Sequence, residues 1–206
     1  VLVDTGPGRE DYVRVPLMMR ALRTVTRMPM DPNEAAVRQV TRLGYRPEEV
    51  RHVVLTHMHF DHCGGLPDFP QATVHVHRRE YEAFRGSPRR FLDLAYVRRH
   101  LAHQPELELY DDGEQPWFDF AAIRLPFEPQ IWLVPLFGQT RGHCGVAVET
   151  GFGWLFNVGS AAPIGFREVV PQRLASLMVG PHAPRLCAFR AAHPGIRMTT
   201  GHMDLA

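Results

Sequence analysis

Residues 57–62 read HMHFDH, so three histidines and one aspartate occupy six positions. The motif follows the apolar run VRHVVLT at residues 50–56, which predicts a buried strand, and two glycines follow it that allow a sharp turn. Neutral imidazoles and carboxylates are the ligands of zinc and similar divalent ions. A polar surface loop does not need this spacing, so the motif predicts a metal site at the end of a strand.

Within the motif, His57 and His59 lie two residues apart at the predicted strand end, where both side chains can point the same way and hold one ion. Asp61 and His62 follow in a turn that can direct them to a second position. Each position needs one more ligand from another part of the chain.

Two histidines far along the chain stand in loops beside predicted strands. His143 lies between glycines in GQTRGHCG, and His202 lies in TTGHMD after the strand predicted at 195–200. Loops at the ends of strands are where functional sites are usually built. We therefore expect His143 to complete the first metal position and His202 to complete the second.

These three motifs, together with VLVDTG at the start of the chain, resemble those of the metallo-β-lactamase-fold hydrolases. The resemblance implies an α+β fold, an αββα sandwich of two mixed β-sheets flanked by helices, built by residues 1–206 as a single domain. It also implies a first metal on three histidines and a second on one aspartate and two histidines. In this sequence the implied ligands are His57, His59 and His143, then Asp61, His62 and His202.

Two further residues belong to the implied site without being metal ligands. Asp4, in the DTG stretch, would lie beside the metal loops and support the ligands. Ser160 stands where most two-metal members have an aspartate that bridges both ions. A hydroxyl in place of that carboxylate removes a negative charge and a strong ligand. We therefore expect Ser160 to form hydrogen bonds beside the site, and the second metal to bind more weakly.

The resemblance implies a metal-dependent hydrolase for an ester, a lactone, a thioester or an amide. The expected cofactor is zinc, as one or two divalent ions, with iron and manganese as alternatives. A bound ion makes water a nucleophile at neutral pH, and Asp61 would act in catalysis by orienting that water. The stretch SAAPIGF lacks a tyrosine that lactonase-like members often have there, which disfavours a lactone. The alternative hypothesis is a degenerate, metal-binding member of the family with little hydrolytic activity. Ser160 favours this alternative, whereas the presence of all six implied metal ligands argues against it.

Composition narrows the expected partners. The 206 residues have a net charge of +1, with 45% hydrophobic and 22% charged side chains, which suits a globular protein and gives no reason to expect nucleic acid or a membrane. We expect a small-molecule substrate. The three cysteines form no CxxC pair, which favours a reducing compartment and a cytoplasmic location. An apolar strand at residue 1 suggests that N-terminal strands are missing.

The rest of the chain reads as a mixture of strands and helices. Helices are predicted at 31–44, 78–85, 88–103, 171–179 and 184–192. Strands are predicted at 1–4, 50–56, 72–77, 121–125, 131–137, 145–150, 153–159 and 195–200. His75 and His77 form a second H-x-H, but no acidic residue follows them, so we expect them on a solvated face of the sheet. We expect His100 to be solvated as well.

Position 160 gives a test of the second metal site. We expect the first position to hold its ion more tightly than the second, because Ser160 leaves the pair of ions without a bridging side-chain carboxylate. Dialysis against limiting chelator should therefore leave close to one ion per chain, and Ser160→Asp should raise the affinity of the second. Equal retention of two ions, together with no effect of Ser160→Asp, would contradict the placement of residue 160 at a metal centre.

Overall fold

The computed structural model describes residues 1–15, 20, 31–161 and 180–200; His202 and the helix predicted at 171–179 lie outside them. The α-helices are α1 (Arg9–Val13), α3 (Ala36–Arg42), α4 (Phe60–Cys63), α5 (Arg78–Arg85) and α7 (Ala183–Ala192). The 3-10 helices are η1 (Pro32–Glu34), η2 (Pro47–Glu49), η3 (Leu66–Asp68), η4 (Phe91–Ala95) and η5 (Arg98–Leu101). No helix within the described ranges has the length and hydropathy needed to cross a membrane.

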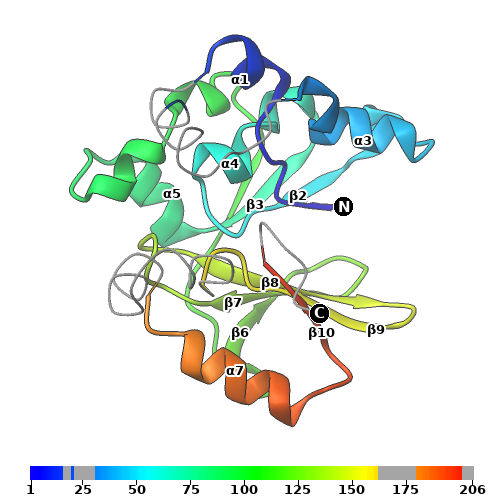
Figure 1. The fold of residues 1–206 in the computed structure, drawn as a ribbon, viewed down its shortest axis with the longest axis vertical. Coiled ribbons are helices and arrows are strands. Elements are labelled where there is room, and N and C mark those ends of the chain that lie inside the picture. Colours follow the sequence, from blue (N-terminus) through cyan, green and yellow to red (C-terminus); the bar gives the residue numbers. More distant parts are fainter. Residues whose placement is uncertain (16–19, 21–30, 162–179, 201–206) are drawn as a thin grey trace. The chain divides into compact units, whose positions relative to one another are not determined.

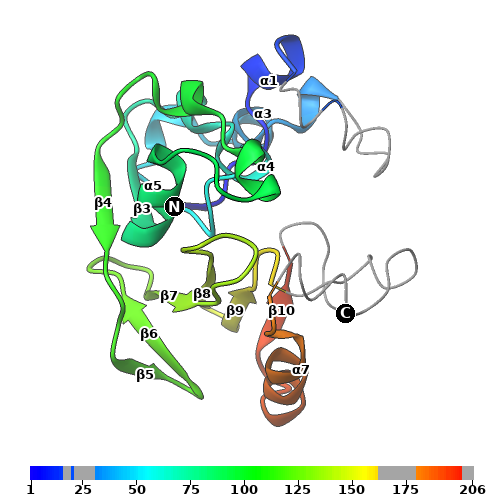
Figure 2. The ribbon, with the colours of Figure 1, turned by 90° about the vertical axis from the view of Figure 1, so that its left-hand side faces the viewer.

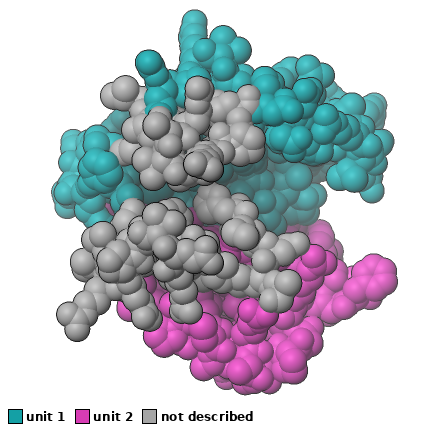
Figure 3. All heavy atoms as spheres, in the orientation of Figure 1, with its two compact units in different colours: residues 1–76, 82–109 teal, residues 77–81, 110–206 magenta. Residues whose placement is uncertain are grey.

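The strands form two sheets, and the chain forms two compact units (Figure 3). The strands are β1 (Leu2–Val3), β2 (His52–Val54), β3 (Thr73–His77), β4 (Leu107–Tyr110), β5 (Gln115–Trp117), β6 (Phe120–Arg124), β7 (Ile131–Pro135), β8 (Cys144–Thr150), β9 (Gly153–Asn157) and β10 (Arg197–Thr199). Unit 1 comprises residues 1–76 and 82–109, and unit 2 comprises residues 77–81 and 110–206. The sequence pattern does not predict β4 or β5.

Unit 1 contains a sheet in the order β1-β2-β3-β4. Both β1 and β3 pair in parallel with β2, so that Val53 lies opposite Leu2 on one side and Val74 on the other. Val53 and Val54 are completely buried, as expected for parallel strands that are covered on both faces. Figure 1 shows α1, α3 and α4 together on one side of β2 and β3. The buried strand predicted before the histidine motif is therefore confirmed, and it ends at Val54.

The helix predicted at 31–44 is present in two pieces. The side chain of Asp31 accepts a hydrogen bond from the backbone N–H of Asn33 at 2.9 Å, so it caps η1 as a helix N-cap does. The chain leaves helical geometry at Ala35, where ψ is 136°, and re-enters it in α3. Gly44 follows with a φ of +87°, a left-handed conformation that suits glycine at a helix end.

The single helix predicted at 88–103 is wrong, because this segment forms η4 and η5 instead. The Asp93 side chain accepts a hydrogen bond from the backbone N–H of Arg90 at 3.1 Å and caps η4 within the segment. Tyr96 then has an extended backbone, with ψ of 123°, and pairs with His59 in an isolated antiparallel bridge. Pairing with the histidine motif thus interrupts a helix that the local pattern favours.

Unit 2 contains a sheet in the order β10-β9-β8-β7-β6-β5. The β10–β9 pair is parallel and the other pairs are antiparallel. The β8–β9 hairpin closes where Thr150 lies opposite Gly153, whose φ of +106° favours glycine. Because β8 and β9 run in opposite directions, the residue before β8 and the residues after β9 lie at the same end of the sheet. Figure 2 shows these strands in sequence beside β10 and α7.

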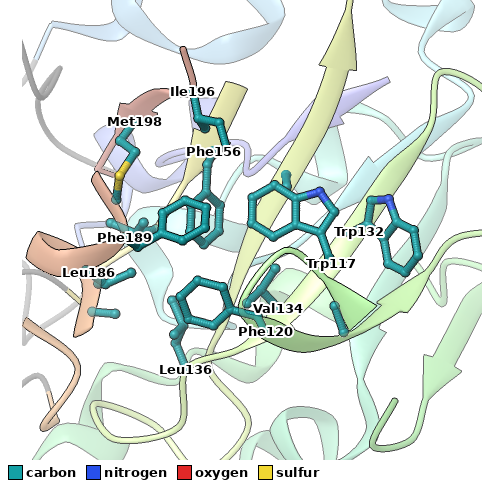
Figure 4. Packing of buried hydrophobic residues seen from close by; sticks show 14 residues of the cluster. Trp117, Phe120, Trp132, Val134, Leu136, Phe156, Leu186, Phe189, Ile196 and Met198 are labelled. Atoms are coloured by element: carbon teal, nitrogen blue, oxygen red, sulfur yellow. The ribbon is translucent and has the colours of Figure 1, made fainter. Parts of the chain in front are cut away.

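The core of unit 2 is rich in aromatic side chains (Figure 4). The ring centroids of Trp117 and Phe156 are 4.9 Å apart, and those of Phe120 and Phe189 are 5.1 Å apart. Leu186 and Phe189 are at most 3% exposed, so α7 packs on the sheet through these side chains. Large rings in edge-to-face contact bury much apolar surface and restrict one another's orientation. This packing fixes the strands that carry the loops of unit 2.

The prediction of a solvated face for His75, His77 and His100 is wrong, since all three are at most 2% exposed. Nε2 of His75 lies 3.0 Å from Nδ1 of His52, and Nε2 of His100 lies 2.9 Å from Oδ1 of buried Asp11. β3 is an inner strand between β2 and β4. Both faces of β3 are buried from Val74 to His77, so the alternation of valine and histidine does not mark a solvent-exposed face there.

His75 makes the stability of the protein sensitive to acid. Burial, with a smaller contribution from His52, lowers the pKa of His75 from 6.5 to about 4. Between these two pKa values the unfolded chain binds a proton at this residue and the folded chain does not, so the free energy of unfolding should fall as the pH drops through this window. Urea unfolding at several pH values should show a loss of as much as about 1.4 kcal/mol per pH unit from this residue.

The matched comparison uses one histidine variant and one variant without a titrating group. His75→Gln removes the titrating ring from the buried pair, so its stability should depend less on pH between about 6.5 and 4 than that of the native protein. Val13→Ala, at an exposed position in α1, changes no titrating group and should leave the slope unchanged. An identical slope for His75→Gln and the native protein would show that His75 titrates normally in the folded state.

Candidate metal centre

The histidine motif forms a tight turn shortly after β2. His59 is the N-cap residue of α4, with an extended backbone at φ −67° and ψ 154°, and Asp61 and His62 lie within that helix. Gly64 follows in close contact with Asp11, because a Cβ at Gly64 would lie 2.2 Å from Oδ2 of Asp11. The first glycine after the motif is therefore required by packing rather than by an unusual backbone angle.

The three imidazole rings of the motif lie against one another in unit 1. The ring centroids of His57 and His59 are 4.7 Å apart, and those of His57 and His62 are 3.9 Å apart. All three side chains are at most 3% exposed. Oδ2 of Asp61 lies 3.7 Å from Nε2 of His62. The structure thus brings together the four motif residues that the sequence singles out.

Asp4 forms hydrogen bonds to the residues that carry these rings. Its Oδ2 accepts hydrogen bonds from Nδ1 of His62 and from the hydroxyl of Thr56, both at 2.8 Å. Its Oδ1 accepts from the backbone N–H of Thr56 at 2.8 Å. The backbone N–H of Asp4 donates to the carbonyl of Val54 at 2.9 Å, which fixes the aspartate to the end of β2. Asp4 adopts a φ of 56°, an uncommon conformation for a residue with a side chain.

This network fixes which ring nitrogen carries the proton in two of the histidines. A carboxylate only accepts hydrogen bonds, so His62 holds its proton on Nδ1. The Thr56 hydroxyl donates to Asp4 and must therefore accept the hydrogen bond from Nδ1 of His57, at 3.0 Å. Both rings then carry their lone pair on Nε2. Histidines that bind metals commonly donate their other ring N–H to an oxygen in this way.

His59 fits a metal ligand for a different reason. Its Nε2 atom is buried and has no hydrogen-bond partner among the described residues. Burial lowers the pKa of His59 to about 4, so the ring is neutral near pH 7. A buried polar atom without a partner costs free energy, and coordination of a divalent ion by a neutral imidazole would remove that cost.

His143 and Ser160 lie together in unit 2, at the shared end of β8 and β9. Nδ1 of His143 donates to the carbonyl of Leu136 at 3.2 Å, which again places the lone pair on Nε2. That lone pair accepts a hydrogen bond from the backbone N–H of Ser160 at 3.0 Å. The Ser160 side chain is buried, and its Oγ has no hydrogen-bond partner among the described residues. A metal ion at Nε2 of His143 would compete with the Ser160 amide.

The expected site residues are divided between the two units. Unit 1 holds Asp4 and the four motif residues, unit 2 holds His143 and Ser160, and His202 lies outside the described residues. Within the described ranges, no group of three or more histidine, cysteine, aspartate or glutamate side chains is arranged to hold a metal ion. That His143 and His202 complete the two metal positions therefore stays a prediction.

Sequence reasoning missed Thr56, which connects Asp4 to the motif. Its hydroxyl lies between the Asp4 carboxyl group and Nδ1 of His57. The only sign of this role in the sequence is that Thr56 directly precedes the first histidine of the motif. A threonine there is also explained by the predicted strand at 50–56, because threonine favours strands. Its contact with residue 4 spans more than 50 residues of sequence and depends on the parallel pairing of β1 and β2.

Comparison with known proteins identifies the family. Residues 1–138 match the family described as the metallo-beta-lactamase superfamily. A probable metallo-hydrolase of Mycobacterium tuberculosis is 41% identical over 164 residues, which cover 78% of this chain and 52% of the relative. An N-acyl homoserine lactonase of Azorhizobium caulinodans is 43% identical over 197 residues, which cover 85% of this chain and 72% of the relative. The chain belongs to the metallo-β-lactamase superfamily, and it spans about half the length of the mycobacterial relative.

Solved structures agree on the fold. An N-acyl homoserine lactone hydrolase, solved with the product N-hexanoyl-L-homoserine at its catalytic metal centre, has a TM-score of 0.65 and 22% identity, covering 97% of this chain and 74% of that one. The dizinc quorum-quenching lactonase AidC has a TM-score of 0.59 and 16% identity, and the match covers 97% of this chain and 67% of AidC. The fold class predicted from the sequence, two sheets flanked by helices of the metallo-β-lactamase type, is confirmed.

The contact between His143 and Ser160 allows a test of the first metal position. Nε2 of His143 has one lone pair, which accepts a hydrogen bond from the Ser160 amide. We expect added zinc to take that lone pair, to shift the Ser160 amide signal in a proton–nitrogen correlation spectrum and to speed its hydrogen exchange. The amide of Val148, in the middle of β8, serves as the control and should not respond. Stoichiometric zinc binding with an unmoved Ser160 signal would exclude this nitrogen as a ligand.

Proposed function

We propose that this chain carries the metal centre of a hydrolase that cleaves an ester, lactone, thioester or amide, with lactones and simple esters as the first candidates. The observation that carries the proposal is the Asp4–Thr56 network, which fixes His57 and His62 with an unprotonated Nε2. Relatives that are named N-acyl homoserine lactonase support lactones among the candidate substrates.

The proposed roles follow from the chemistry of the side chains. When bound, a divalent ion makes water a nucleophile at neutral pH and polarises the substrate carbonyl. Zinc is the proposed ion, with iron and manganese as alternatives. Asp61 would orient the attacking water and accept its proton, while Asp4 keeps His62 in the tautomer that a ligand needs. The proposed ligands are His57, His59 and His143 for the first ion, and Asp61, His62 and His202 for the second.

A second candidate is a metal-binding protein with little hydrolytic activity. Ser160 favours it, because a buried hydroxyl stands where a bridging carboxylate would hold two ions together. The stretch SAAPIGF also lacks the tyrosine that lactonase-like members often have there. Activity on a panel of substrates separates the two candidates.

Asp4→Asn tests the observation on which the proposal rests. An amide at position 4 has one oxygen acceptor where the carboxyl group now uses two, so it cannot accept from both the Thr56 amide and Nδ1 of His62 without loss. We expect zinc affinity, measured by competition with a chromogenic chelator, to fall by about 10- to 100-fold. Hydrolysis of N-hexanoyl-homoserine lactone, an aryl ester, a thioester and a β-lactam should be measured on the zinc-loaded native protein and on the variant.

The matched control is Asp31→Asn. Asp31 is an exposed N-cap residue of η1, where asparagine caps about as well as aspartate, so neither zinc affinity nor activity should change. The native protein should hydrolyse at least one member of the panel. Full zinc loading without turnover of any substrate would refute the hydrolase proposal and favour the second candidate, a metal-binding protein with little activity. Unchanged zinc affinity in Asp4→Asn would refute the role of the Asp4–Thr56 network.

A further inference from the structure

Glu80, near the start of α5, is completely buried. Glutamate is rarely buried in full, because removing its carboxyl group from water costs free energy unless hydrogen bonds compensate. Glu82, two residues further along the same helix, is exposed. The burial of Glu80 is therefore specific to its position rather than to the helix as a whole.

The carboxyl group of Glu80 contacts the loop that leads to His143. Its Oε2 accepts a hydrogen bond from the backbone N–H of Gly142 at 3.1 Å. Gly142 also lies so close to α5 that a Cβ there would be 2.1 Å from the backbone nitrogen and 2.6 Å from the Cα of Glu80. Only glycine fits at position 142, and glycine has more backbone freedom than any other residue. The hydrogen bond that Gly142 donates to Glu80 restricts that freedom at the residue directly before His143.

Two residues near Glu80 in the sequence contact the same loop at Phe137. The guanidinium of Arg79 lies 4.9 Å from the ring centroid of Phe137, and the ring of His77 lies 5.1 Å from it. Nδ1 of His77 accepts a hydrogen bond from the backbone N–H of Arg79 at 3.2 Å, which orients the ring. The end of β3 and the start of α5 thus form a support for the loop 137–143, and all of these residues belong to unit 2.

Two hydrogen bonds join the two ends of the loop, Leu136 and His143. The backbone N–H of Leu136 donates to the carbonyl of His143 at 3.0 Å, and Nδ1 of His143 donates to the carbonyl of Leu136. These two bonds set the position of the ring relative to β7. The contact between Glu80 and Gly142 then sets the direction from which the chain arrives at His143.

We propose that Glu80 is a positioning residue, which fixes Gly142 and thereby aims the imidazole of His143 at the metal. This inference rests on the proposed function, because it assigns His143 as a ligand. The positioning role depends on the length of the Glu80 side chain more than on its charge, because that length brings Oε2 to the Gly142 amide. A residue that acted only through its charge would tolerate a shorter carboxylate side chain and would not tolerate a neutral one of the same length.

Two variants separate reach from charge. Glu80→Asp keeps the carboxyl group but shortens the side chain by one methylene, so it should withdraw the acceptor from Gly142. Glu80→Gln keeps the length and an acceptor oxygen but removes the ionisable group. We expect Glu80→Asp to lower zinc affinity by about tenfold or more, as loss of a partner that orients a ligand does, and Glu80→Gln to retain most of the native affinity. Glu82→Asp, on the exposed side of α5, is the control and should bind zinc as the native protein does.

Hydrogen exchange of the Gly142 amide, measured without metal, tests the contact itself. It should be slow in the native protein and in Glu80→Gln and faster in Glu80→Asp. Urea unfolding of each metal-free variant shows whether zinc affinity changes beyond any loss of stability. If Glu80→Gln binds zinc more weakly than Glu80→Asp, or if both bind as the native protein does, the positioning role is refuted while the proposed function stands. If the native protein binds no zinc, the proposed function fails and the positioning role fails with it, and the exchange data still report whether the contact with Gly142 exists.

Discussion

The hydrogen bonds of Asp4 hold the candidate site of unit 1 together. Its backbone bonds to the end of β2 through Val54, and its carboxyl group bonds to Thr56 and His62. One side chain therefore connects the first strand, the second strand and α4. Because the carboxyl group only accepts, it also decides where the protons of the neighbouring rings lie. The local backbone at Asp4 is unusual, with φ of 56°, and four hydrogen bonds hold the residue in that conformation.

A comparable arrangement surrounds His143 in unit 2, although different elements build it. The antiparallel pairing of β8 and β9 brings Ser160 to His143, and the aromatic core under α7 keeps these strands in place. In both units Nδ1 of a candidate ligand donates a hydrogen bond to an oxygen. In unit 1 Nδ1 of His57 donates to the Thr56 hydroxyl, and in unit 2 Nδ1 of His143 donates to the Leu136 carbonyl. The same protonation pattern from unrelated partners is what a metal ligand requires of its surroundings.

Membership of the metallo-β-lactamase superfamily explains the fold and the type of site, but it does not choose a substrate. The sheets and the motif position the candidate ligand side chains, whereas substrates are in general distinguished by the loops around a site. The curated relatives include lactonases and a probable mycobacterial metallo-hydrolase, and the match covers 52% of the latter. Ser160 differs from the aspartate expected in most two-metal members, and the missing tyrosine differs from the pattern of lactonase-like members.

The sequence by itself determined the features that depend on neighbouring residues. The HMHFDH spacing, the apolar strand before it and the two strands predicted at 145–150 and 153–159 are local patterns, and the structure contains a strand at each of these places. Only the tertiary structure decided which residues became buried or paired over long distances. His75 is buried because β3 lies between two other strands, and the helix predicted at 88–103 is interrupted because Tyr96 pairs with His59. The contact of Glu80 with Gly142 likewise joins residues 62 positions apart, and side-chain burial of this kind depends on the neighbouring elements, which no local pattern specifies.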